Sequence, residues 1–123
     1  MWPFSNHSAA VLEALDRSQA VIEFEPNGKI VTANANFLTV MGYGLDEIVG
    51  RHHSIFVDPA EVKTEAYQAF WRELGAGRYQ SAEFKRLGKG GREIWIQATY
   101  NPVLDRSGKV VRVVTFATDV SAR

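Results

Sequence analysis

Apolar and polar positions follow two different periods at the start of the chain. Over residues 20–25, the apolar Ala20, Ile22 and Phe24 alternate with Val21, Glu23 and Glu25, which is typical of a β-strand with one buried face. Residues 26–29 are Pro-Asn-Gly-Lys. Because Asn and Gly tolerate positive φ, they predict a hairpin turn into a second strand at Ile30. Before the first strand, residues 7–17 carry apolar side chains at helical spacing, which predicts a short amphipathic helix.

The middle of the chain has helical signals instead. Residues 34–41 predict a short helix and residues 45–49 a second one. Each is followed by a glycine, Gly42 or Gly50, which suits the left-handed conformation after a helix. Residues 51–58 show no regular pattern. From residue 59 to residue 74 the apolar side chains follow one stripe, which predicts a single longer helix that begins at a proline.

Three further strands are predicted at residues 79–87, 92–103 and 109–118, separated by glycine-containing turns. Consecutive strands joined by tight turns pair in antiparallel fashion. The helices must then cover one face of the sheet. The pattern therefore predicts an α+β fold with a five-stranded antiparallel sheet, short helices on one face and an N-terminal amphipathic helix.

Composition narrows the range of functions. A chain of 123 residues is expected to form one domain. Lys and Arg number 14, as do Asp and Glu, so no excess of positive charge indicates nucleic-acid binding. The absence of cysteine excludes disulfides, thiolate catalysis and Cys-ligated metal centres. No apolar run reaches about 18 residues and no signal sequence is visible, so we expect no direct membrane insertion and a cytoplasmic location.

Three motifs in order resemble PAS domains over residues 18–121. They are GKIVTANANFLTVMGYGLDEIVG at 28–50, KRLGKGGREIWIQATYNPVLDRSGKVV at 85–111 and TDVS at 118–121. The last is similar to the Asp-x-Thr element that closes PAS domains and leads into an output helix. The resemblance implies a PAS sensor domain at 18–121, so the expected organisation is an N-terminal cap helix within 1–17, this domain, and the start of an output linker at 122–123.

The stretch from HHSIFVDPAE at residue 52 to NPVLD at residue 105 is similar to PAS domains of bacterial chemotaxis-type receptors, the methyl-accepting aerotaxis and biofilm-dispersion sensors. This resemblance implies a sensory input domain for signal transduction. Such a domain detects a small ligand, or a redox or oxygen signal, and passes it to a C-terminal output.

By the same resemblance, the inner face of the sheet lines a mostly apolar pocket. Residues 94–101 alternate strictly, so every second side chain of this strand points inward. The small side chains of Ala98 and Ala117 leave room for a ligand. The expected pocket consists of Ile22, Phe24, Ile55, Tyr67, Phe70, Ile94, Ile96, Ala98, Val113, Thr115 and Ala117.

The cofactor is unknown from the sequence. His53 is a possible axial haem ligand, because some PAS domains place a His in this region. The alternative is that, of His52 and His53, one is exposed and one is hydrogen-bonded at a helix entrance. Flavin is disfavoured, since the chain lacks the Cys that binds flavin in light-sensing PAS domains, and the flavin contacts of the aerotaxis receptor are replaced at 57–60 and at Gln80. No metal site is expected.

The outer face of the sheet carries Trp95, and a large exposed apolar side chain often marks a partner surface. One alternative is that the chain's own N-terminal helix covers Trp95. This helix is too short to cover the whole face, so we expect a homodimer in which a second copy completes the cover. Asp119 is expected to cap the end of the last strand. The expected dimer and signalling face consists of Val11, Leu15, Trp95, Val114, Phe116 and Asp119.

Catalysis is not indicated. The glycines at 88–91 lack the spacing of a phosphate-binding loop, and no Ser-His-Asp set or His-Glu-x-x-His motif is visible. The predicted function is therefore non-catalytic sensing. The main alternative is a ligand-free PAS module for dimerisation and protein interaction, and a small enzyme is the weaker third reading.

Overall fold

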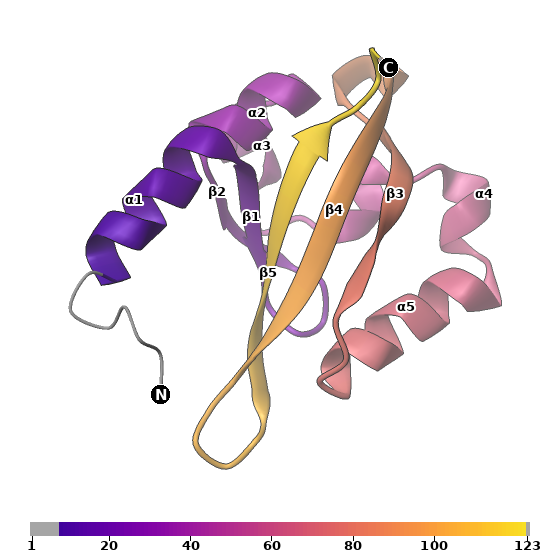
Figure 1. The fold of residues 1–123 in the computed structure, drawn as a ribbon. Coiled ribbons are helices and arrows are strands. Elements are labelled where there is room, and N and C mark those ends of the chain that lie inside the picture. The colour runs from indigo at the N-terminus through magenta and orange to yellow at the C-terminus, as the bar shows by residue number, and fades with distance from the viewer. Residues whose placement is uncertain (1–7, 123) are drawn as a thin grey trace.

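The computed structural model describes residues 8–122, and its centre is a twisted antiparallel sheet (Figure 1). Residue 7, predicted to begin the first helix, lies outside the described residues. The strand order is β2-β1-β5-β4-β3, with every neighbouring pair antiparallel, as predicted. The strands are β1 (Ala20–Phe24), β2 (Ile30–Ala33), β3 (Gln80–Leu87), β4 (Glu93–Leu104) and β5 (Val110–Asp119).

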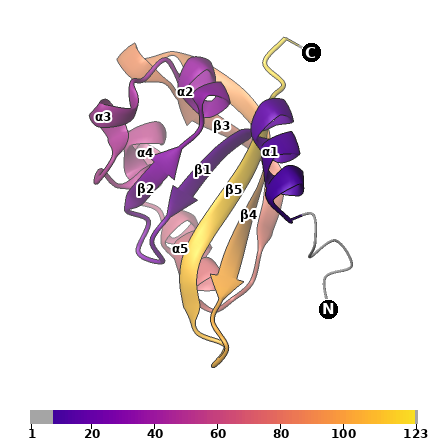
Figure 2. The same cartoon turned by 90° about the vertical axis from the view of Figure 1, so that its left-hand side faces the viewer.

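The helices lie on both sides of this sheet. Those between β2 and β3 cover one face, and α1 lies on the other side, near β1 and β5 (Figure 2). Among the described residues, no helix is long and apolar enough to cross a membrane. The helices are α1 (Ser8–Ser18), α2 (Ala35–Met41), α3 (Leu45–Ile48), α4 (Pro59–Val62) and α5 (Glu65–Gly75), with short 3₁₀ turns η2 (His53–Phe56) and η3 (Lys89–Gly91).

Asn34 ties α1, β1 and α2 together. Its side-chain oxygen accepts hydrogen bonds from the backbone N–H of Phe37, at 3.0 Å, and of Val21, at 2.9 Å. Its amide nitrogen donates to the carbonyl of Asp16 in α1 at 3.1 Å and to that of Gln19 at 2.8 Å. The first contact caps α2, because it satisfies a backbone donor that has no partner inside the helix. At the other end of α2, Gly42 has φ +78°, the left-handed conformation predicted for it.

The single helix predicted for residues 59–74 is wrong, because the chain forms two helices there. Thr64 has extended φ and ψ values, and its hydroxyl accepts a hydrogen bond from the N–H of Tyr67 at 3.2 Å, so it begins α5 as an N-cap. The same hydroxyl donates to the carbonyl of Glu61 at 2.7 Å, which ends α4. The preceding segment, predicted to be irregular, contains the 3₁₀ turn η2.

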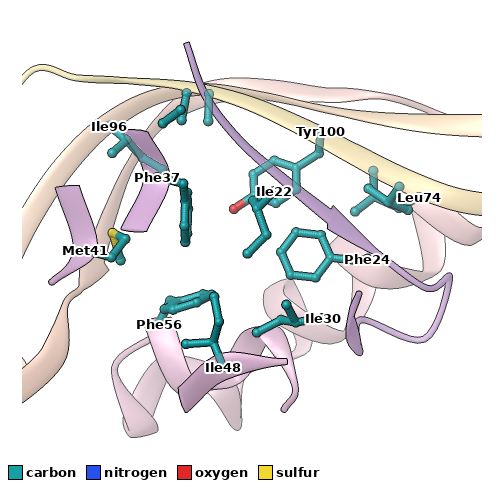
Figure 3. Packing of buried hydrophobic residues seen from close by; sticks show 14 of the residues in the cluster. Ile22, Phe24, Ile30, Phe37, Met41, Ile48, Phe56, Leu74, Ile96 and Tyr100 are labelled. Atoms are coloured by element: carbon teal, nitrogen blue, oxygen red, sulfur yellow. The ribbon is translucent and has the colours of Figure 1, made fainter. Parts of the chain in front are cut away.

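The hydrophobic core lies between the inner face of the sheet and the covering helices (Figure 3). The predicted alternation along β4 is confirmed, since its inward side chains are buried while Trp95 and Gln97 are exposed. Aromatic rings meet edge to face in this core, for example Phe37 and Phe56 at 5.4 Å between centroids. The largest fully buried side chains are Phe24, Phe56, Ile22, Ile30, Met41, Ile48, Leu74, His53, Val113 and Thr115.

Candidate functional site

The register of the sheet places three inner-face residues in one row. Thr115 on β5 lies opposite Ile22 on β1 and opposite Tyr100 on β4. Directly opposite residues in antiparallel strands have their side chains on the same face and close together. Thr115 and Tyr100 therefore bring two hydroxyl groups into an otherwise apolar core.

His53 lies against this row, at the start of η2. In a 3₁₀ turn, residues three apart face the same side, so His53 and Phe56 both point into the core. The imidazole is 1% exposed. Its Nδ1 lies 2.8 Å from the hydroxyl of Tyr67 on α5, and its Nε2 lies 2.9 Å from the hydroxyl of Tyr100. Both ring nitrogens are thus hydrogen-bonded inside the protein.

Arg86 on β3 brings a buried positive charge to the same place. Its side chain is 4% exposed, and its Nε and Nη2 donate to the hydroxyl of Tyr100 at 3.4 and 3.3 Å. The guanidinium lies over the ring of Phe84, with 4.5 Å between its central carbon and the ring centroid. A carboxylate oxygen of Glu61, which is half-exposed, lies 3.7 Å from Nη1. Both contacts favour the cation, which would otherwise be costly to bury.

The far end of this network is Trp71 on α5, whose indole N–H donates to the hydroxyl of Tyr67 at 3.2 Å. Five side chains therefore form one connected series from β3 to α5, which we name the buried polar chain. Its members in order are Arg86, Tyr100, His53, Tyr67 and Trp71.

Burial sets the protonation states of the buried polar chain. The pKa of His53 lies well below its ordinary value, first because burial disfavours the charged imidazolium and then because Arg86 and His52 repel it. Burial also raises the pKa of Tyr67 to about 12 and raises the pKa of Tyr100 above its ordinary value. At neutral pH the imidazole is therefore neutral and both phenols keep their protons.

A small cavity adjoins the buried polar chain. Its volume is about 10 Å³, room for about one water molecule. The hydroxyl of Thr115, which lines this cavity, is buried and has no hydrogen-bond partner among the described residues. Figure 3 shows several of the cavity's apolar neighbours, with the hydroxyl of Tyr100 pointing into the core. The lining residues are Ile22, Phe24, Phe37, Met41, His53, Phe56, Arg86, Ile96, Tyr100 and Thr115.

The predicted pocket residues lie in this region, although their role as ligand contacts stays a prediction. Four of them line the cavity: Ile22, Phe24, Ile96 and Thr115. Four others are buried in the surrounding core: Ile94, Ala98, Val113 and Ala117. Tyr67 belongs to the buried polar chain, while Phe70 and Ile55 are half-buried against the core.

Sequence reasoning placed Tyr100 on the inward face of β4, through the alternation of residues 94–101, but did not include it among the expected pocket residues. It missed Arg86, which had a weaker signal. Arg86 shares the inner face of β3 with Phe84 two residues earlier, but an arginine in a strand near the surface ordinarily faces water.

The residues around His53 do not fit haem. Both imidazole nitrogens already bond to tyrosine hydroxyls, so neither has a lone pair directed at open space. The adjoining cavity, at about 10 Å³, is far smaller than a porphyrin. The pair matches the alternative given for it. His52 is exposed and its Nδ1 accepts from the N–H of Ser54, while His53, the first residue of η2, is hydrogen-bonded through both ring nitrogens. Among residues 8–122, no group of three or more His, Asp and Glu side chains is placed to hold a metal ion.

The outer face of the sheet is more open. A groove of about 410 Å³ lies between α1 and the sheet. Leu15 of α1 lines it together with Val114 and Phe116 of β5, while Val11 is half-buried. The helix does not cover Trp95, which is 46% exposed, so the alternative that the chain's own helix covers it is wrong for the single chain.

The end of β5 is fixed against Trp95. A carboxylate oxygen of Asp119 accepts from the N–H of Ser121 at 2.8 Å, which is the predicted cap. The hydroxyl of Ser121 accepts from the N–H of Trp95 at 2.8 Å, and the N–H of Val120 donates to the carbonyl of Trp95 at 2.9 Å. The chain therefore leaves the domain along a defined path beside β4.

Comparisons with known proteins identify relatives among bacterial sensors. The chain is 46% identical over 111 residues to the biofilm dispersion protein BdlA of Pseudomonas aeruginosa. This match covers 90% of this chain and 27% of BdlA. It is 32% identical over 93 residues to the aerotaxis receptor of Escherichia coli, covering 73% of this chain and 18% of the receptor. It therefore spans about a quarter or less of the length of these relatives.

Other relatives weigh against the expectation that flavin is disfavoured. A blue-light-activated histidine kinase of Brucella abortus is 27% identical over 127 residues, covering 91% of this chain and 25% of the kinase. A solved light-oxygen-voltage domain studied with a flavin analogue has a TM-score of 0.76 at 25% identity, covering 96% of this chain and 90% of that one. The side chains that fill this core nevertheless leave a cavity too small for a flavin ring.

The family itself follows from a match that spans most of the chain. Residues 15–123 match the family described as PAS fold. This range contains the whole sheet, the covering helices and the buried polar chain. The chain belongs to the PAS-fold family and is a PAS sensory domain related to chemotaxis-type and biofilm-dispersion sensors.

Proposed function

We propose that this domain is the input module of a chemotaxis-type receptor, in which a small ligand, or a redox or oxygen signal, acts on the buried polar chain. The observation that carries the proposal is the burial of His53, Arg86 and Tyr100 around a cavity. Burying a charge and several hydroxyls costs free energy that apolar side chains of similar size would not. Buried groups with shifted pKa values, gathered at a cavity, are typical of functional sites.

The sheet provides a route from this site to the output. Tyr100 and Trp95 belong to the same strand, β4, on opposite faces. A change in the hydrogen bonds of Tyr100 acts on the strand whose backbone at Trp95 holds Val120 and Ser121. A signal coupled in this way needs a ligand that prefers one of two states of the strand. Asp119, which caps this exit, is the residue at which the coupling is tested.

The proposed role is non-catalytic and cytoplasmic. Support for the first part comes from the closed position of the polar groups, since the imidazole of His53 is 1% exposed and both its nitrogens are engaged. Some relatives are named as histidine kinases, but the matched region is about a quarter of such a protein. Catalysis in those proteins therefore does not transfer to this domain.

A second candidate function is a ligand-free dimerisation module. Two observations favour it: the cavity has room for about one water molecule, and the outer face of the sheet carries both Trp95, which is 46% exposed, and the groove under α1. In this case a second copy covers the outer face and forms a homodimer. The two candidates share the outer face as a signalling surface and differ in whether the core responds to a ligand.

The proposed function is tested by a domain exchange. Residues 15–123 replace the matching segment of BdlA, and dispersion of the biofilm is measured in cells that lack their own copy. A responsive chimera is expected, because the two segments are 46% identical. Asp119→Ala in the chimera should abolish the response and leave resistance to limited proteolysis unchanged, whereas Asp105→Ala, in the distant β4–β5 turn, serves as the control. A folded chimera with no response contradicts the proposal.

Mass spectrometry under native conditions separates the two candidate functions. A small molecule that co-purifies with the wild-type chain and is lost in Arg86→Gln supports sensing. Two results together favour the dimerisation module. The first is a dimer that carries no small molecule in the mass spectrum, and the second is a BdlA chimera that responds equally well with Arg86→Gln.

A further inference from the structure

The ends of the buried polar chain fix the direction of its hydrogen bonds. Arginine and the indole of tryptophan can only donate. Tyr100 must therefore accept from Arg86, and Tyr67 must accept from Trp71. Between these ends, His53 is neutral and has one nitrogen that donates and one that accepts.

Two arrangements of the protons satisfy these conditions with the same heavy-atom positions. In the first, the hydroxyl of Tyr100 donates to Nε2 of His53, and Nδ1–H donates to Tyr67. In the second, the hydroxyl of Tyr67 donates to Nδ1, and Nε2–H donates to Tyr100. The two arrangements differ in the tautomer of His53 and in which tyrosine has a hydroxyl proton left over.

The position of that remaining proton distinguishes the two arrangements. In the first it belongs to Tyr67, on the side of α5. In the second it belongs to Tyr100, which lines the cavity beside the unpartnered hydroxyl of Thr115. The positive charge of Arg86 makes the hydroxyl of Tyr100 a better donor to His53, so it favours the first arrangement. An acceptor in the cavity favours the second, because it takes the proton of Tyr100.

We propose that the cavity between Thr115 and Tyr100 is a binding site for one water-sized, uncharged molecule that accepts a hydrogen bond, and that its occupancy sets the tautomer of His53. The size follows from the volume of about 10 Å³, and the polarity from the two hydroxyls that meet there. Arg86 lines the same cavity and disfavours a cation. This inference rests on the proposed function, because it describes how the sensory core responds.

Water is the probe molecule in the test, because it fits the volume of the cavity and can accept a hydrogen bond. Long-range proton–nitrogen correlation spectra report which nitrogen of His53 carries the proton, and His53→Gln identifies the signals. We expect the Nε2–H tautomer in the wild-type protein. Thr115→Val removes one of the two hydroxyls that hold the water without changing the side-chain shape. It should shift the tautomer ratio toward Nδ1–H by roughly fivefold, the ratio that one net hydrogen bond supports.

Thr115→Ser is the matched control, because it keeps the hydroxyl and should keep the wild-type tautomer. Thermal unfolding adds a second readout. If water bridges Thr115 and Tyr100, Thr115→Val lowers Tm. If the hydroxyl of Thr115 has no partner, removing it raises Tm, and the proposal is overturned. One tautomer in all three proteins also overturns it. If either result overturns this inference while the BdlA chimera still responds, the proposed function is retained.

Discussion

The two faces of the sheet are built from the same strands but differ in how completely they are covered. On the inner face, Tyr100 is 2% exposed, and its hydroxyl contacts both His53 and Arg86. On the outer face, Trp95 is 46% exposed, and a groove of about 410 Å³ separates Phe116 from α1. The comparison shows that β4 has a closed side, where a few polar groups are buried in an apolar core, and an open side, where Trp95 is exposed.

The largest expected effect is a loss of stability when a tightly packed ring on the inner side of the sheet is removed, compared with a loosely packed ring on the outer side. Phe56→Ala removes a 2%-exposed ring that contacts Phe37 and Tyr43, and should lower the free energy of unfolding by about 3–5 kcal/mol. Phe116→Ala removes a half-buried ring from the outer face and should cost about 1 kcal/mol. Urea unfolding measures both. Equal losses would mean that a second copy closes the outer face as tightly as the inner one.

The next effect concerns hydrogen bonds and compares two adjacent histidines. His53→Leu leaves the hydroxyls of Tyr67 and Tyr100 short of a partner, at roughly 1–3 kcal/mol each, so we expect a loss of about 2–6 kcal/mol. His52→Leu removes the exposed cap of Ser54 and should cost about 1 kcal/mol. Unfolding curves of the two variants at pH 7.5 check this order. The reverse order would show that the buried polar chain contributes no stability.

The pH dependence of stability tests whether His53 is held neutral. Its pKa is lowered in the folded protein, so between the folded value and about 6.5 the unfolded chain binds more protons. The contribution of neutral His53 to the free energy of unfolding is therefore fully present above pH of about 6.5. It decreases as the pH falls through this window, by up to about 1.4 kcal/mol per pH unit. His53→Gln should lose this slope between pH 7 and 5. The pKa values of Glu47 and Asp105 are also lowered, but their effects fall below pH of about 4.5. An unchanged slope in His53→Gln would assign the pH dependence to other groups.

The smallest effect on stability belongs to Trp95→Asp, although its effect on assembly should be large. The change places a charge on the outer face and should convert a dimer to a monomer in light scattering at high micromolar concentration, with less than about 1 kcal/mol lost from the monomer. Tyr79→Asp is the control, because Tyr79 is 68% exposed and lies outside the sheet. If the wild-type protein is a monomer at that concentration, the proposed homodimer is wrong.

Most of the fold was predictable because its signals are local. The alternation along residues 94–101, the glycine after α2 and the turn at 26–29 each depend on neighbouring residues, and each has its expected structure. The break between α4 and α5 was missed because one apolar stripe continues across it. Its signal was Thr64, whose hydroxyl can cap a helix only if the backbone there becomes extended.

The candidate site was less predictable, because it depends on which of two neighbours points inward. His52 and His53 are the same residue type, and only the 3₁₀ turn decides that His53 joins the core. Arg86 lies on the inner face through the register between β3 and β4, where it is opposite Ile94. Local alternation with Phe84 indicates which face Arg86 shares, but only the pairing between distant strands decides that this arginine meets Tyr100.

The first edge of the sheet has a consequence for how the protein avoids fibrous aggregation. Ile30 at the edge strand β2 donates its N–H to the carbonyl of Arg51 at 2.7 Å and accepts from Gly50 at 2.9 Å, so this part of the edge is already paired. Gly28 allows that approach, since its φ is +90° and a Cβ there would lie 2.5 Å from the ring of His52. The opposite edge, β3, carries the charged side chains of Glu83 and Lys85. Both devices discourage strand-to-strand growth, which would otherwise continue without limit. Even at high local concentration, copies of this domain are therefore hindered from adding their strands to one another's sheet edges.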